Sequence, residues 1–116
     1  MTRPDHGKSD ALTALAATPC RPGLPALNDG ELAARLAILA GWERRGVAIE
    51  KTFQFAQYME TIGFVNALAW IAQRQDHHPD IAVGYHRCTV VWTTHDAGGV
   101  TLNDCVAAAR TDALLT

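Results

Sequence analysis

Residues 84–95 have the sequence GYHRCTVVWTTH, in which apolar and polar side chains alternate. A period of two is typical of a β-strand with one buried face and one exposed face. One set is apolar and consists of Cys88, Val90 and Trp92. The other set is mostly polar. In a regular strand Tyr85 and His95, ten residues apart, would both lie on this polar face.

The same period of two appears upstream, between Trp42 and Phe55. One face there would carry Ile49, Lys51, Phe53 and Phe55. Gly46 lies where a tight turn would join two strands, so we predict a β-hairpin. Downstream of residue 95, Ala97-Gly98-Gly99 predicts another turn, followed by a short strand at Val100.

Three segments have helical spacing instead. The first begins at Asn28 or Asp29, which suit an N-cap, and ends at Gly41. The second spans residues 56–76 and ends near His77, because Pro79 disfavours helix at the residue before it. Its apolar stripe would consist of Tyr58, Ile62, Val65, Ala69 and Ala72. The third opens with the capping-box pattern Thr101-Leu-Asn-Asp104 and continues to about residue 114.

The order of elements is therefore helix, hairpin, helix, one or two strands, helix. This order predicts an α+β fold in which the helices cover one face of an antiparallel sheet. Residues 1–25 contain four prolines and little periodicity. We expect residues 1–23 to form a flexible arm and residues 24–116 to form one domain.

Composition excludes several classes of function. The net charge is −2 and no run of basic residues occurs, which argues against a nucleic acid or an anionic membrane as partner. Residues 11–19 weakly resemble the apolar part of a secretory signal, but they are short and follow Asp5 and Asp10. The three cysteines are widely spaced and odd in number, so we expect a reducing cytoplasm rather than a disulfide framework.

The densest polar cluster is Asp76-His77-His78-Pro79-Asp80, and His95 follows further along the chain. Histidine exchanges protons near neutral pH, so this cluster is a candidate for acid–base catalysis. If Gln73 and His77 share the last helical turn, the amide could orient the imidazole. Two histidines before a proline are also common at a helix end, where a cation suits the helix dipole.

Two other chemistries are open to these residues. His77, His78, His95, Asp76 and Asp80 are ligand types suited to zinc. Adjacent histidines in extended chain point to opposite sides, however, so they chelate one ion poorly. A cysteine nucleophile is a weaker prediction, because Cys88 falls on the apolar strand face.

The polar residues also occur at fixed spacings. His77-His78-Pro79 is followed after five residues by Tyr85, after nine more by His95, and after eight more by Asp104. This pattern resembles the signature of the pterin-4a-carbinolamine dehydratases. The supporting matches are Gly41-Trp42, Phe53-Gln-Phe55, Gly63-Phe64-Val65-Asn66 and the His-Asp-Ala-Gly-Gly turn that begins at His95. The resemblance covers roughly residues 24 to 114.

The resemblance implies a four-stranded antiparallel sheet with three helices on one side, assembled as a dimer or as a homotetramer of paired dimers. It also implies an activity. A 4a-hydroxytetrahydropterin, left by an aromatic amino-acid hydroxylase, loses water to give the quinonoid dihydropterin, with neither metal nor other cofactor. His77, His78 and His95 would be the catalytic set. Asp104, Gln73 and Tyr85 would support them or bind substrate.

One position departs from the family pattern. The family usually has an acidic residue four positions before the first histidine, and this chain has Gln73 there. An amide orients a ring without adding charge, so we expect lower activity or an optimum at lower pH.

The resemblance also implies an alternative function. Some animal relatives act as dimerisation cofactors of a homeodomain transcription factor and use a helix surface to do so. A non-catalytic binding protein of the same fold is therefore the second hypothesis, and turnover of the pterin distinguishes the two.

Overall fold

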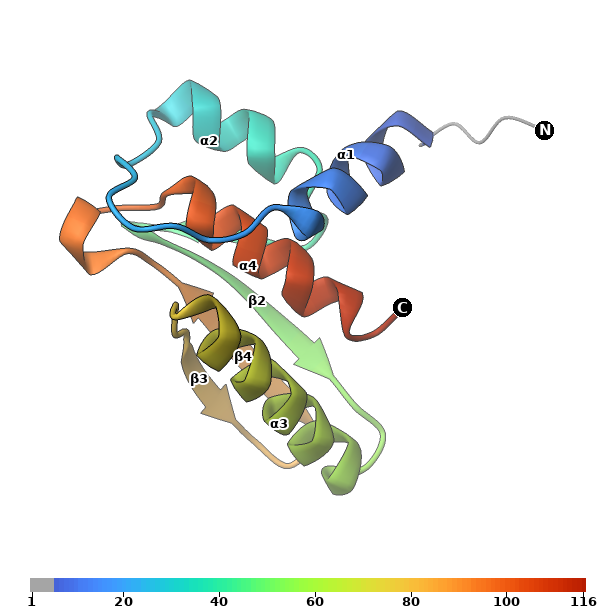
Figure 1. The fold of residues 1–116 in the computed structure, drawn as a ribbon. Coiled ribbons are helices and arrows are strands. Elements are labelled where there is room, and N and C mark those ends of the chain that lie inside the picture. Colours follow the sequence, from blue (N-terminus) through green and yellow to red (C-terminus); the bar gives the residue numbers. More distant parts are fainter. Residues whose placement is uncertain (1–5) are drawn as a thin grey trace.

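The computed structural model describes residues 6–116, with side chains from residue 10 onward (Figure 1). Its elements, in chain order, are α1 (His6–Ala17), α2 (Asp29–Leu36), β1 (Glu43–Arg45), β2 (Ala48–Gln54), α3 (Tyr58–Gln75), β3 (Asp80–Val83), β4 (Arg87–Trp92), a 3₁₀ turn (His95–Ala97) and α4 (Leu102–Ala113).

The four strands form one antiparallel sheet with the order β1-β2-β4-β3. The predicted hairpin is confirmed, and Gly46 at its turn has a φ of +59°, a conformation that favours glycine. The predicted alternation in β4 is also confirmed. Its apolar set, Cys88, Val90 and Trp92, is fully buried. The predicted α+β class and the four-stranded antiparallel sheet are therefore correct.

The position of the fourth strand was predicted wrongly. No strand forms at Val100; Thr94 and Gly99 make only an isolated bridge there. The fourth strand is instead β3, which precedes β4 and lies at the sheet edge. It has four residues, most of them exposed, so it carries little of the alternation by which a strand is recognised.

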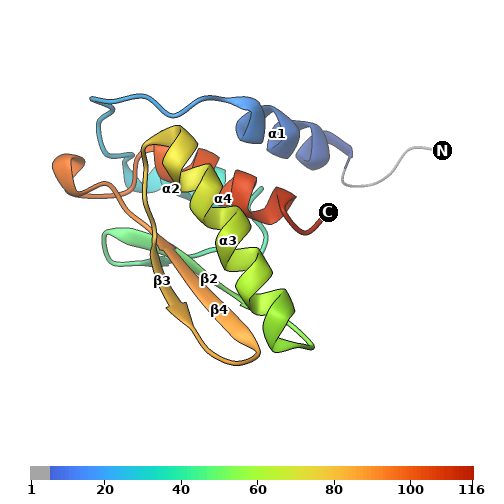
Figure 2. The same ribbon diagram turned by 60° about the horizontal axis from the view of Figure 1, so that its bottom comes forward.

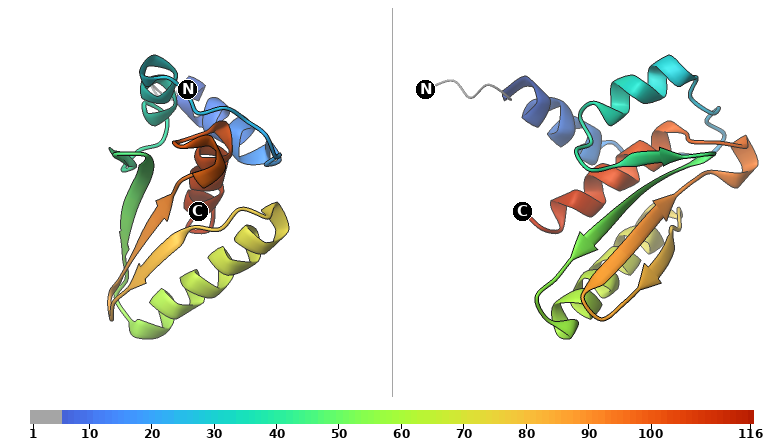
Figure 3. Two further views of the ribbon diagram at one scale, coloured as in Figure 1. Left: turned by 90° about the vertical axis from the view of Figure 1, so that its left-hand side faces the viewer. Right: turned by 180° about the vertical axis from the view of Figure 1, so that it is seen from behind.

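Helices α3 and α4 both pack against β4, and Figures 2 and 3 show them on the same side of the sheet. The buried stripe of α3 is Thr61, Phe64, Leu68 and Ala72. The predicted stripe is therefore wrong at Tyr58 and Ala69, which are exposed, and right at Ala72. Thr61 misled the prediction: it is a polar residue that is fully buried, and its hydroxyl donates to the carbonyl of Tyr85.

The described residues contain four α-helices, not three. The additional one is α1, which occupies part of the predicted arm and packs along α4 (Figure 2). Leu15 of α1 is buried in the core. On α4, residues 105–109 are buried on every side, and three of them are alanines that permit close approach. Within residues 6–116, no helix has the length and apolar character needed to cross a membrane.

Candidate functional site

The end of α3 directs His77 into the molecule. The helix ends at Gln75, and Asp76 takes a left-handed conformation with a φ of +49°. The His77 N–H then donates to the Ala72 carbonyl at 3.2 Å, which closes the turn. This turn places the imidazole against the indole of Trp92, with ring centroids 5.3 Å apart and planes 17° apart.

A buried carboxylate fixes the other edge of that imidazole. His77 Nε2 lies 2.6 Å from Oδ1 of Asp104, a residue with no exposed surface. Asp104 Oδ2 accepts from the Thr94 hydroxyl and from the Thr101 N–H, each at 2.8 Å. We assign the proton between His77 and Asp104 to Nε2, because two donors already bind the other oxygen of the carboxylate, as suits an ionised acceptor.

A chain of hydroxyl groups supports the carboxylate. The hydroxyls of Thr94 and Thr101 are 2.9 Å apart. Since the single hydroxyl proton of Thr94 goes to Asp104, the Thr101 hydroxyl must be the donor in this contact. Asp104 therefore has two roles, because it completes the N-terminal cap of α4 and also orients His77.

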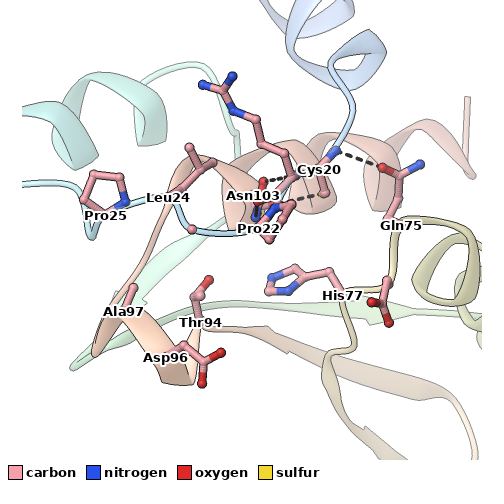
Figure 4. Close-up of a pocket in the computed structure, with 13 residues that line it drawn as sticks. Cys20, Pro22, Leu24, Pro25, Gln75, His77, Thr94, Asp96, Ala97 and Asn103 are labelled. Atoms are coloured by element: carbon pink, nitrogen blue, oxygen red, sulfur yellow. Dashed lines mark hydrogen bonds between the residues drawn. The ribbon is translucent and has the colours of Figure 1, made fainter.

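His77 faces a cavity of about 620 Å³ (Figure 4). Three segments contribute to its lining: residues 20–25, residues 75–77, and the turn that carries Thr94, Asp96 and Ala97. Asn103 completes it. Figure 4 shows the His77 ring pointing toward Thr94, below Pro22 in this view. Nδ1 of His77 makes no hydrogen bond to the described residues. It is not buried either, so it is open to a ligand. A neutral imidazole in this tautomer presents a lone pair at Nδ1 and is suited to act as a base.

The other predicted site residues lie elsewhere. His78 and His95 are exposed and do not line the cavity, although each is next to a residue that does. Tyr85 is 66% exposed and lies just before β4, at the end of the strand away from Trp92. Because β4 ends at Trp92 and does not extend to His95, it does not align the two side chains. Gln73 is exposed, and its predicted helical pairing with His77 fails because the helix ends at Gln75.

The cysteine side chains are unsuited to nucleophilic chemistry. All three are unpaired, and Cys88 is buried on the apolar strand face as predicted. Cys20 lies at the cavity, and the pKa of its thiol is raised. Burial is the largest cause; Arg110 lowers the pKa by less than burial raises it, and Asp104 raises it further. Burial, reinforced by the Asp104 charge, raises the pKa of Cys105 to about 12. These thiols therefore stay protonated near neutral pH.

Among residues 10–116, no three histidine, cysteine, aspartate or glutamate side chains are grouped so as to hold a metal ion. The geometry gives the zinc-site hypothesis no support.

Most of the residues that line the cavity were not predicted from the sequence, among them Cys20, Gln75, Thr94 and Asn103. Thr94 carried a weak signal, since it is next to His95. The other three had none, because they meet only when the segment before α2 crosses the ends of α3 and α4.

Comparison with known proteins gives a consistent result. Residues 25–114 match the family model described as pterin 4 alpha carbinolamine dehydratase. A relative from Chromobacterium violaceum, which carries the provisional name pterin-4-alpha-carbinolamine dehydratase, is 50% identical over 103 residues. The match covers 89% of this chain and 94% of the relative. A protein from Paracidovorax citrulli with the same provisional name is 55% identical over 94 residues, covering 78% of this chain and 81% of the relative.

Two solved structures share the fold. The crystal structure of a transcriptional coactivator/pterin dehydratase from Brucella melitensis aligns with a TM-score of 0.76 and 31% identity, over 78% of this chain and 99% of that one. A pterin dehydratase-like protein described as a RuBisCO assembly factor in the alpha-carboxysome aligns with a TM-score of 0.54 and 26% identity. That match covers 63% of this chain and 84% of the other.

Proposed function

The chain belongs to the pterin 4 alpha carbinolamine dehydratase family, and from that premise we propose that it removes water from a 4a-hydroxytetrahydropterin to give the quinonoid dihydropterin. This reaction would recycle the pterin cofactor of aromatic amino-acid hydroxylases. The observation that carries the proposal is the His77–Asp104 pair at the wall of a cavity large enough for a small organic ligand.

The reaction moves two protons, and His77 is placed to move one of them. His77 Nδ1 takes the proton from N5, the N5–C4a double bond forms, and the C4a–O bond breaks. Asp104 stabilises the imidazolium that results, through Nε2. The departing hydroxyl receives a proton and leaves as water. His78 and His95 flank the cavity residues and are the proposed donors of that second proton.

The substrate's other end requires hydrogen-bond acceptors. A pterin carries an N3–H and a 2-amino group on one edge. Asp76 and Asp96 line the cavity with His77 and offer carboxylates to that edge. We assign no part in binding to Tyr85 or Gln73, since neither lines the cavity nor is next to a residue that does.

The test is a stopped-flow measurement of 4a-hydroxytetrahydropterin breakdown with and without the purified protein. We expect acceleration that a chelator leaves unchanged. Loss of the acceleration on chelation, with recovery on adding zinc, would show that a metal takes part. No acceleration at any protein concentration would contradict the proposed function.

We also propose that the protein is a homo-oligomer, a dimer or tetramer. Met59 and Trp70 lie three turns apart on α3, and they are 72% and 66% exposed. Large apolar side chains so placed favour association. Light scattering at micromolar concentration should give a mass well above 12.5 kDa, and Trp70→Lys should lower it. A wild-type mass near that of one chain would contradict the proposal.

The second candidate function is a non-catalytic binding protein. The exposed face of α3 favours it, and one structural relative is described as an assembly factor. A binding-only protein would form the oligomer without accelerating dehydration. For location, we propose the cytoplasm, since three unpaired thiols suit a reducing compartment.

A further inference from the structure

One wall of the cavity comes from a segment that the family match barely includes. We name residues 18–25 the strap. Every residue from Cys20 to Pro25 lines the cavity (Figure 4), whereas the family model matches only from residue 25 onward. The remaining lining residues, His77 among them, belong to the matched region.

Side chains of α3 and α4 hold the strap by its backbone. Gln75 Oε1 accepts from the Cys20 N–H at 2.9 Å. Asn103, which is nearly buried, binds Arg21 twice: Oδ1 accepts from the backbone N–H at 3.0 Å, and Nδ2 donates to the carbonyl at 2.6 Å. Arg110 donates to the Thr18 carbonyl at 3.0 Å. These contacts fix the position of the strap without depending on its side chains.

The strap is also stiff. Pro19, Pro22 and Pro25 each have a restricted φ. Gly23 supplies the single left-handed residue, with a φ of +78°. Beyond the strap, the Leu27 N–H donates to the Val100 carbonyl at 2.8 Å, which ties the chain down again. Proline restricts the unfolded chain, so ordering such a segment costs less conformational entropy than ordering an average loop.

We infer that the strap is a specificity-determining wall for the substituent at C6 of the pterin, and that Gln75 and Asn103 are positioning residues that hold it. This inference rests on the proposed function. C6 is bonded to N5, so a group that takes the N5 proton has the C6 substituent beside it. Near His77 the cavity has two walls: the 94–97 turn, with Thr94 and Asp96, and the strap. The polar turn suits the amino-pyrimidinone edge.

The strap suits the substituent. It offers Pro22, Leu24 and Pro25 to the carbon chain and backbone groups to hydroxyls. The chemical class expected there is a short hydroxyalkyl chain.

The test measures equilibrium binding of two stable product-like compounds by calorimetry: a 7,8-dihydropterin with a 6-dihydroxypropyl chain and one with a 6-methyl group. Gln75→Leu removes the acceptor for Cys20, whereas Gln75→Glu keeps it. Asn103→Ala removes both contacts to Arg21. Gln54→Leu is the matched control, because Gln54 is exposed on β2 and outside the cavity. Circular dichroism checks that each variant is folded.

In Gln75→Leu we expect the Kd of the dihydroxypropyl compound to rise roughly fivefold, the equivalent of one hydrogen bond, while the Kd of the methyl compound changes less than about twofold. Asn103→Ala should give a rise of roughly tenfold or more. Gln75→Glu and Gln54→Leu should discriminate between the two compounds as the wild type does.

Two results overturn the inference alone: both compounds weakened equally in Gln75→Leu, or both unchanged. The proposed function has a separate outcome. A wild-type protein that binds neither compound and shows no turnover overturns that function and this inference with it.

Discussion

At each end of strand β4 lies a cluster of aromatic rings that includes a histidine. The two clusters differ in what holds the imidazole. At the Trp92 end, His77 stacks on the indole and meets the buried Asp104. At the Arg87 end, the ring centroids of Tyr85 and His86 lie 4.3 Å apart, and those of Tyr58 and Tyr85 lie 5.4 Å apart. These rings are exposed, and none has a carboxylate partner among the described residues' hydrogen bonds and ion pairs. Ring contact alone therefore does not make a site; the oriented, buried carboxylate distinguishes the first cluster.

The strongest way to break this comparison is Asp104→Asn, which keeps the shape of the side chain but removes its charge. An amide can present an N–H to Nε2 and reverse the tautomer of His77. We expect kcat to fall by about 100-fold or more, the usual size of a general acid–base contribution. Steady-state dehydration rates measure this. Asp80→Asn, an exposed change on β3, is the control and should keep the wild-type rate. An Asp104→Asn protein with full activity would show that the carboxylate only caps α4.

The same residue should matter for stability. Asp104→Ala leaves the Thr101 N–H and the Thr94 hydroxyl without their buried acceptor. We expect the free energy of unfolding to fall by about 2 kcal/mol, from the lost cap and the unpaired donors. Urea denaturation checks this. Asp80→Ala should change it by less than about 0.5 kcal/mol, and an Asp104→Ala loss no larger than that would contradict the account.

The far end of β4 should tolerate change. Tyr85 is 66% exposed, and within the part of the chain that the structure describes its side chain makes only ring contacts. We expect Tyr85→Ala to leave kcat within about twofold, since it touches neither His77 nor the cavity, and to cost less than about 1 kcal/mol of stability. A large loss of kcat in the folded variant would mean that the second cluster takes part in the reaction.

The smallest effect concerns the thiol at the cavity. Because burial raises the pKa of Cys20, less of it is thiolate at a given pH than in a free cysteine. Iodoacetamide should label Cys20 of the native protein more slowly than a free thiol at pH 8, with the rate still rising above pH 9. Mass spectrometry of the labelled peptide measures this. Labelling faster than the free thiol would reveal an activated cysteine that the structure does not show.

Local patterns predicted the parts of the fold that local chemistry determines. The alternation in β4, the turn at Gly46 and the capping box at Thr101 each depend on neighbours within a few residues. The capping box even placed Asp104 at a helix start, and only the fold shows that the same carboxylate meets His77. A histidine at the site could also be predicted from the sequence, because proton exchange near neutral pH is a property of the residue itself.

The failures all required distant contacts or an irregular backbone. Helix α1 forms from an alanine-rich stretch whose apolar side packs on α4, a partner far along the chain. The pairing of Tyr85 with His95 assumed a strand that in fact gives way to a 3₁₀ turn. The pairing of Gln73 with His77 assumed a helix that the left-handed Asp76 ends. The strap meets Asn103 across more than 80 positions of sequence.

The central claim is that His77, and no other histidine to the same degree, carries the proton transfer. The most direct measurement is the stopped-flow rate of water loss from 4a-hydroxytetrahydropterin in His77→Ala, His78→Ala and His95→Ala, with the fold of each checked by circular dichroism. We predict that His77→Ala lowers kcat by about 100-fold or more, and that His78→Ala and His95→Ala each lower it by less. A His77→Ala protein that keeps its wild-type rate, or loses less than either of the others, would contradict the claim.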